Sequence, residues 1–181
     1  MQAREDILRG KKFKFWTQAG VFSKEKIDEG TKLLLANIEI KKGARILDLG
    51  CGYGAMGIVA ASISEGKVFL VDSDIRAVRL AEKNLAENKI KDGEVKISDG
   101  FSDLGEEKFD LILTYPPSHE GKEIVEGFVK GASVRLNKNG KFYLVTEKRL
   151  KSYFERILKM NFRENKIIIE NKSYVLFLAE N

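Results

Sequence analysis

The chain has 181 residues, of which 43% are hydrophobic and 33% are charged, and its formal net charge is +5. This length suits one well-buried core and is too short for two ordinary domains, so we expect a single domain over residues 1–181. No apolar run reaches the roughly 18 residues that a membrane span needs, and the charged segment 1–14 lacks the apolar stretch of a secretory signal. A single cysteine excludes an internal disulfide. These features predict a cytoplasmic protein that does not insert into membranes.

The basic excess, 32 Lys and Arg against 27 Asp and Glu, is compatible with a polyanionic partner such as RNA. A composition rich in Lys and Glu is equally typical of thermophilic proteins with many surface ion pairs, so charge alone leaves both interpretations open. Basic residues cluster at 9–14 and 148–151, where we expect any phosphate contacts. Phe13, Phe15 and Trp16 alternate with the first cluster, which favours one face of a strand over a base-stacking surface.

The N-terminal segment predicts a hairpin over 13–22 that turns near 18–20, and then a helix over 24–37 with Ser23 as its N-cap. From residue 44 on, strands and helices alternate. The predicted strands of this part cover 44–49, 67–71, 94–97, 109–113 and 141–146, and the predicted helices cover 53–63, 75–87, 119–136 and 148–159. Such alternation implies right-handed crossovers and a mostly parallel sheet with helices on both faces.

The C-terminal segment departs from this alternation. Two apolar runs, 166–169 and 174–178, are separated by a turn at 170–173, and so short a link makes them antiparallel. The sequence therefore predicts an α/β fold whose mostly parallel, seven-stranded sheet ends in a C-terminal antiparallel hairpin, with a short N-terminal hairpin as an extension.

The segment 45–54, RILDLGCGYG, joins an apolar strand to a glycine-rich turn through Asp48. Gly50, Gly52 and Gly54 at alternate positions permit a sharp turn at the strand end and let a ligand approach main-chain N–H groups with no Cβ in the way. This combination indicates a bound nucleoside cofactor.

A dinucleotide-binding fold is the alternative for this turn. Gly52, Gly54 and Gly57 spell GxGxxG, and an acidic residue, Asp72, follows about 20 positions further on. Asp48 separates the two interpretations, because a carboxylate there would repel a pyrophosphate but suits a ligand with an ammonium group. S-adenosylmethionine carries such a group and is the cofactor that we expect.

Aspartates also end the next two predicted strands. Asp72 can accept two hydrogen bonds from a ribose diol that lies across the strand ends, or it can merely cap the helix that starts near Asp74. Asp99 can accept from an adenine amino group, or it can be an ordinary turn residue beside Gly100. We favour the cofactor roles and include Gly100 and Ser73, the neighbours of these aspartates, in the predicted site.

The segment 114–121, TYPPSHEG, follows the fourth strand of the core. Pro116 and Pro117 fix φ and remove two N–H donors, so the carbonyls before them stay rigid and can accept from a ligand. A rigid loop here can hold an amine in line with a methyl sulfonium; the alternative is a stiff turn. His119, the only histidine, is more typical of a surface or capping position, and one histidine with one cysteine predicts no zinc site.

Taken together, these motifs resemble class I S-adenosylmethionine-dependent methyltransferases. The segments 20–23, GVFS, and 26–34, KIDEGTKLL, are similar to the GVFS…LDxGTxLL signature of the RsmC-like group. That group comprises guanine-N2 methyltransferases of small-subunit ribosomal RNA and single-domain archaeal relatives. The segment 116–121, PPSHEG, is similar to the group's NPPFHxG, and the resemblance extends over about 13–145.

The resemblance implies a cofactor site in which residues 1–40 close over a core of 41–181. Asp48 and the three glycines after it would line the methionine end, Asp72 the ribose and Asp99 the adenine. The residues that would hold the cofactor are Phe22, Ser23, Thr31, Asp48, Gly50, Gly52, Gly54, Asp72, Ser73, Asp99 and Gly100.

The catalytic loop would consist of Tyr115, Pro116 and Pro117, with Ser118 and His119 at the substrate. Tyr115 stands where the family has an Asn that accepts from the amine, and Ser118 replaces an aromatic that stacks on the base. A phenol is longer than an amide and is also a donor. The resemblance implies methylation of an exocyclic amine of guanine in RNA, most of all ribosomal RNA. The alternatives are a small-molecule methyltransferase of precorrin type, a catalytically weak cofactor-binding module that acts through a partner and, more distantly, a dinucleotide dehydrogenase.

Overall fold

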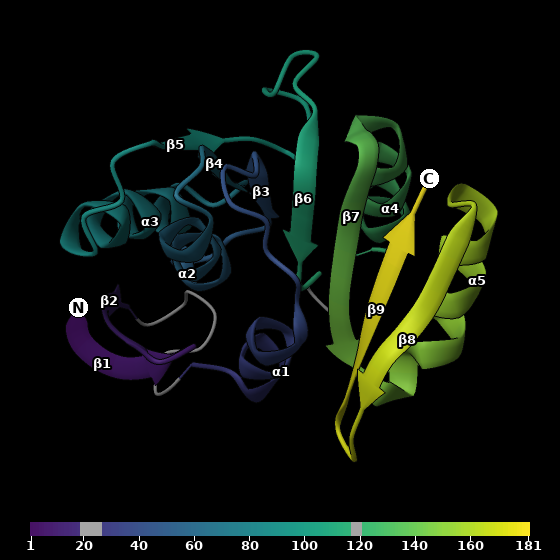
Figure 1. Ribbon diagram of the computed structural model, residues 1–181, viewed down its shortest axis with the longest axis horizontal. Coiled ribbons are helices and arrows are strands. Elements are labelled where there is room, and N and C mark those ends of the chain that lie inside the picture. The colour runs from purple at the N-terminus through teal and green to yellow at the C-terminus, as the bar shows by residue number, and fades with distance from the viewer. Residues whose placement is uncertain (19–26, 117–120) are drawn as a thin grey trace.

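The computed structural model describes residues 1–18, 27–116 and 121–181, which form two β-sheets and five α-helices (Figure 1). The small sheet consists of β1 (Gln2–Leu8) and β2 (Lys11–Thr17). The strands of the main sheet are β3 (Ile46–Leu49), β4 (Val68–Asp72), β5 (Gly93–Ile97), β6 (Phe109–Thr114), β7 (Leu136–Glu147), β8 (Glu164–Glu170) and β9 (Tyr174–Glu180).

The main sheet has seven strands in the order β5-β4-β3-β6-β7-β9-β8. The strands β3 to β7 pair in parallel, whereas β9 is antiparallel to both β7 and β8. The predicted α/β fold with a C-terminal antiparallel hairpin is therefore confirmed. The strand order reverses at β3, with β4 and β5 on one side and β6 and β7 on the other. In open α/β sheets such a reversal opens a crevice at the carboxyl ends of the strands, where ligands bind.

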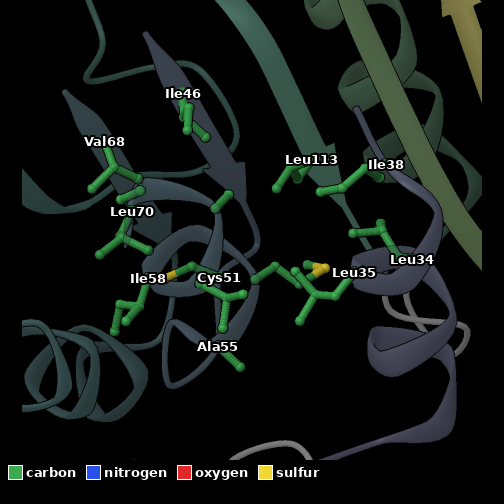
Figure 2. Close-up of a cluster of buried hydrophobic side chains, with 14 of the residues drawn as sticks. Leu34, Leu35, Ile38, Ile46, Cys51, Ala55, Ile58, Val68, Leu70 and Leu113 are labelled. Carbon is green, nitrogen blue, oxygen red and sulfur yellow. The ribbon is translucent and has the colours of Figure 1, made fainter. Parts of the chain in front are cut away.

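Helices cover both faces of the main sheet, as the alternation of strands and helices predicts (Figure 1). One face packs against α1 (Glu29–Asn37), α2 (Ala55–Ser64) and α3 (Ile75–Glu87), and the other against α4 (Lys122–Arg135) and α5 (Lys151–Asn161). Neighbouring strand residues point to opposite layers, so Ile46 joins the first cluster and Leu47 the second. Figure 2 shows the first cluster, in which side chains of α1 and α2 meet Leu70 of β4 and Leu113 of β6.

The N-terminal hairpin lies earlier in the chain than predicted. Leu8 pairs with Lys11, and the two residues between them, Arg9 and Gly10, both have positive φ, at 53° and 78°. A two-residue loop with both φ values positive matches the twist of antiparallel strands. The prediction that the strand from residue 13 on is the first strand of its hairpin is therefore wrong, because it is the second, and Arg-Gly is not one of the usual sequence signals for this turn. The predicted turn near 18–20 and the rest of the predicted hairpin, from residue 19 to 22, lie outside the described residues except for Gln18.

The hairpin is fastened to α3 through two asparagines. Asn84, which is fully buried, accepts from the backbone N–H of Trp16 (2.6 Å) and donates to the carbonyls of Trp16 (3.0 Å) and Tyr53 (2.8 Å). Asn88 exchanges the same pair of hydrogen bonds with the backbone of Lys14. Since Tyr53 belongs to the glycine-rich turn, Asn84 joins three parts of the chain.

We expect Asn84→Ala to lower the free energy of unfolding by roughly 2 to 4 kcal/mol, because it leaves buried N–H and C=O groups without partners. Urea denaturation measures this loss. Asn161→Ala is the control, since the Asn161 side chain, at the end of α5, donates one local hydrogen bond, to the carbonyl of Ile157. Equal losses for the two variants would contradict the role of Asn84 in fastening the hairpin.

The first helix begins later than the predicted residue 24. Residues 27 and 28 are not helical, and Asp28 is the N-cap of α1, where Oδ1 accepts from the N–H of Gly30 at 2.7 Å. The predicted cap, Ser23, lies outside the described residues. Within the described ranges, no helix has the length and apolar character that crossing a membrane requires.

Candidate cofactor and substrate site

A cavity of about 270 Å³ opens at the carboxyl ends of β3, β4, β5 and β6, where the strand order reverses. Nine of the predicted site residues line it: Thr31, Gly50, Gly52, Asp72, Ser73, Asp99, Gly100, Tyr115 and Pro116. Asp48 and Gly54 are not in this lining. The five other predicted residues, Phe22, Ser23, Pro117, Ser118 and His119, lie outside the described residues.

The glycine-rich turn has the backbone conformation that its sequence predicts. The φ values of Gly50, Gly52 and Gly54 are 70°, 55° and 89°, a region that residues with a Cβ rarely adopt. Their N–H groups, however, have partners within the protein: Gly50 donates to the carbonyl of Val71, Gly52 to Asp72 and Gly54 to the carbonyl of Cys51. The glycines therefore shape the floor of the cavity, and these three N–H groups do not point to a ligand.

Asp48, a residue of β3, is fully buried against α2. Its Oδ2 accepts from the N–H of Gly57 at 2.7 Å, while Oδ1 has no partner among the described residues. Burial raises the pKa of Asp48 to about 8, and the charge of Asp72 contributes to this shift. A Cβ on Gly57 would lie 2.8 Å from the Asp48 Cβ and 2.5 Å from Leu70 Cδ2, so packing accounts for this glycine. The contact of Asp48 with an ammonium group stays a prediction.

Asp72 is held by the backbone with its carboxylate at the cavity. Its Oδ2 accepts from the N–H of Gly52 and its Oδ1 from that of Asp74, both at 2.9 Å. The N-cap of α3 is Asp74, whose Oδ1 accepts from Arg76 at 2.8 Å. Asp72 is therefore not that cap. Each of its oxygens keeps acceptor capacity beyond the backbone bond, so the carboxylate can still accept from a diol.

The Phe128 ring forms an apolar surface next to Gly50 and Gly100. An added Cβ would lie 3.4 Å from the Phe128 ring at Gly50 and 3.5 Å from it at Gly100, so the ring lies close to both strand ends. Ile124, one turn earlier in α4, lines the same cavity. Exposed Asp99 lies on its rim. A flat apolar surface beside a carboxylate suits a purine base with an amino group. Sequence reasoning missed Phe128 and Ile124, because their helical spacing signals only a core-facing helix.

Tyr115, which also lines the cavity, contacts Tyr174 of β9 edge to face, with ring centroids 6.2 Å apart and planes at 89°. The Tyr174 hydroxyl donates to Asp28 Oδ2 at 3.3 Å. Burial raises the pKa of both tyrosines, and the charge of Asp28 adds to the effect. Glu147, which pairs with Tyr174 in the sheet, also lines the cavity. No local signal in the sequence marks Tyr174 or Glu147 as part of the site.

The two basic clusters lie in different places. Lys11, Lys12 and Lys14 line a groove of about 780 Å³ between the hairpin and the ends of α2 and α3, remote from the strand carboxyl ends. The cluster 148–151 directly follows Glu147 and therefore lies beside the cavity. Its cations form exposed ion pairs with Glu147 and Glu170, and such pairs contribute little to stability and exchange readily.

In the described part of the chain, no group of three or more His, Cys, Asp or Glu side chains is arranged to hold a metal ion.

Residues 12–178 match the family model described as methyltransferase small domain. The chain is 34% identical over 167 residues to ribosomal RNA small subunit methyltransferase C of Haemophilus influenzae (strain 86-028NP), which covers 90% of this chain and 49% of the relative. It is 32% identical over 180 residues to the uncharacterized protein YbxB of Bacillus subtilis (strain 168), covering 96% of this chain and 88% of YbxB. The chain thus spans about half the length of the Haemophilus relative.

Among solved structures, the T. thermophilus 16S rRNA guanine-N2 methyltransferase RsmC, in complex with AdoMet and guanosine, is similar to this chain with a TM-score of 0.90 and 31% identity. The match covers 99% of this chain and 50% of that one. Precorrin-6y C5,15-methyltransferase from Geobacter metallireducens GS-15 has a TM-score of 0.73 at 12% identity, a likeness of fold alone.

Proposed function

The chain belongs to the methyltransferase small domain family, and we propose that it transfers a methyl group from S-adenosylmethionine to the exocyclic amine of a guanine in RNA, foremost ribosomal RNA. The observation that carries the proposal is the similarity, with a TM-score of 0.90 over 99% of the chain, to a guanine-N2 methyltransferase whose complex holds AdoMet and guanosine. A ribosomal RNA substrate agrees with the cytoplasmic location that the sequence predicts.

The residues of the cavity fit this cofactor. Asp72 has acceptor capacity for a ribose diol, and Phe128 with Asp99 suits the adenine. The turn at Gly50 and Gly52 forms the floor on which the methionine part would lie. When bound, S-adenosylmethionine supplies an electrophilic methyl group on a sulfonium centre.

The part of the cavity at Tyr115 and Pro116 is suited to hold an amine. Tyr115 and Pro116 directly follow β6 and line the cavity, and Pro116 has no N–H that would compete with the amine. Because burial raises its pKa, Tyr115 stays a neutral phenol at physiological pH and acts by positioning rather than as a base. A hydrogen bond from the amine to the Tyr115 oxygen would orient the nitrogen and strengthen it as a nucleophile. The cluster 148–151, beside this cavity, is the surface on which we place the RNA phosphates.

Incubation of the protein with methyl-labelled cofactor and total RNA tests the proposal. We expect labelled N2-methylguanosine after nuclease digestion, and RNA affinity that falls as salt rises. Label that appears only in protein or in small molecules would exclude an RNA substrate.

In the same assay, Tyr115→Asn tests the alternative of a catalytically weak cofactor-binding module. A large gain in turnover with asparagine would favour a degenerate site, whereas a loss would show that Tyr115 has its own role.

A further inference from the structure

The backbone of Tyr115 is restrained on both sides of the residue. Thr114, the last residue of β6, is fully buried, and its hydroxyl donates to the carbonyl of Leu49 at 2.9 Å. Pro116 follows Tyr115, and a proline restricts its own φ as well as the backbone of the residue before it. The place of the phenol in the cavity therefore depends on the side-chain torsions of Tyr115, which contacts with its ring can limit.

Two residues from distant parts of the chain lie against the Tyr115 ring. Tyr174, at the start of β9, packs on it edge to face, with ring centroids 6.2 Å apart and planes at 89°. Gly30, in the first turn of α1, lies beside both rings, since an added Cβ would be 3.0 Å from Tyr115 Cε1 and 3.1 Å from Tyr174 Cδ1. Both distances are shorter than ordinary van der Waals contact. The two rings therefore occupy the space that a Cβ on Gly30 would need.

Space, and not backbone conformation, accounts for the glycine at position 30. Gly30 is a helical residue without a positive φ, so alanine would suit the backbone of α1 better than glycine does. Asp28, the N-cap of α1, fastens the arrangement: its Oδ1 accepts from the N–H of Gly30 at 2.7 Å and its Oδ2 from the Tyr174 hydroxyl at 3.3 Å. One carboxylate thus joins the start of the helix to Tyr174.

We propose that Gly30 and Tyr174 are positioning residues for the methyl transfer, which hold the Tyr115 ring at one angle and so keep its phenol end where the substrate amine binds. The proposal rests on the proposed function and deepens it. Among the described residues, Tyr115 lines the cavity whereas Gly30 and Tyr174 do not, so their contacts reach the cavity through the Tyr115 ring. A phenol oxygen lies further from the backbone than the amide oxygen of the resembling family. The same torsional change moves it further, and a firm support for the ring matters more.

Two variants of Tyr174 separate its ring from its hydroxyl. Tyr174→Phe keeps the ring, and we expect it to retain most of the wild-type kcat for RNA methylation. Tyr174→Leu removes the ring, and kcat should fall roughly 10- to 100-fold, because a small displacement of a positioning group costs this much. Calorimetry should show unchanged cofactor affinity in both variants. Tyr153→Leu is the control, since the Tyr153 ring also packs edge to face, on Phe154 at 5.3 Å, and neither of these two described residues lines the cavity.

Gly30→Ala tests the second contact of the Tyr115 ring. The added methyl group must displace one of the two rings, so kcat should fall clearly, again with unchanged cofactor affinity. In a Tyr115→Asn background the large ring is gone, and adding Gly30→Ala should cost clearly less. Gly127→Ala is the matched control, because Gly127 is also a helical glycine, in α4, but no described atom lies within 4 Å of a Cβ added there.

Wild-type kcat in Tyr174→Leu would overturn the proposal. Equal losses in Tyr174→Phe and Tyr174→Leu would do so as well, because the effect would then belong to the hydroxyl. Equal costs of Gly30→Ala in the wild-type and Tyr115→Asn backgrounds would show that the glycine does not act through the Tyr115 ring.

Melting temperatures test the contact between the rings without any substrate. Tyr115→Leu and Tyr174→Leu break the same ring contact, so the double variant should lose clearly less than the sum of the two single losses. Additive losses would mean that the rings do not support each other, and the proposal would be wrong whatever the substrate. A wild-type protein that does not methylate RNA would by itself remove only the proposed function.

Discussion

Asp72→Ala is expected to weaken the binding of S-adenosylmethionine by at least about 100-fold. The variant removes both oxygens that would accept from the ribose diol, and each such charge-assisted bond contributes about 1.5 to 3 kcal/mol when shielded from water. It also releases the N–H groups of Gly52 and Asp74, which the carboxylate now holds at 2.9 Å. The floor of the cavity therefore loses its shape together with its acceptor. Calorimetric titration with the cofactor measures the change.

Asp74→Asn is the matched control for Asp72→Ala. Asp74 lies two residues away and lines the same cavity, but Arg76 occupies its carboxylate through the backbone N–H and the guanidinium. Asparagine is an equally good N-cap, so we expect the affinity to change only a few-fold. An unchanged affinity in Asp72→Ala would refute the ribose assignment. A rise in melting temperature with NAD would instead support the dinucleotide alternative.

The second large effect concerns the pH dependence of stability, through Asp48. Burial raises the pKa of Asp48 from 3.8 to about 8 in the folded protein. Between these two pH values, the folded state therefore keeps a proton on Asp48 that the unfolded state has lost. The stability that this proton contributes is fully present below about pH 4 and is lost as the pH rises toward 8, by on the order of 1 kcal/mol per pH unit. Asp48→Asn carries no such proton. The free energy of unfolding of the wild type minus that of Asp48→Asn should therefore fall from pH 5 to 8 and then level off.

Urea denaturation across this pH range measures that difference, and a difference independent of pH would show that Asp48 is ionised throughout. The cofactor adds a second comparison. If its ammonium group acts on Asp48, as the sequence predicts, a saturating amount of cofactor should make the difference in unfolding free energy fall less steeply with pH, because a nearby cation favours the carboxylate.

The sequence predicts best what depends on neighbouring residues. The glycine turn directly follows its apolar strand, and Asp72 ends the apolar run of the next one, so the parallel sheet and the placement of Asp72 can be read from local pattern. The hairpin is predicted too late in the chain because its turn, Arg9-Gly10, lacks a recognised signal. The aromatic residues that mark the predicted strand do lie on it, with Phe13 and Phe15 buried.

The parts of the site that could not be predicted depend on contacts between distant residues. Asp28 and Tyr174 are 146 positions apart, and Asn84 lies 68 positions from Trp16. Neither pair has a spacing rule, because the contact exists only after the sheet and helices have assembled. Phe128 could not be predicted for another reason: its helix buries apolar residues in the core, and nothing local distinguishes the one that also lines the cavity.

The attachment of the N-terminal hairpin has a consequence for how the molecule opens. In the described residues neither β1 nor β2 pairs with the main sheet, so the hairpin can detach in a local fluctuation without breaking the central ladder. Each detachment withdraws Trp16 from Asn84 and leaves the Asn84 amide with Tyr53 alone. Opening of the hairpin is thereby linked to the order of the glycine turn, and a ligand that fixes this turn also makes the hairpin harder to open.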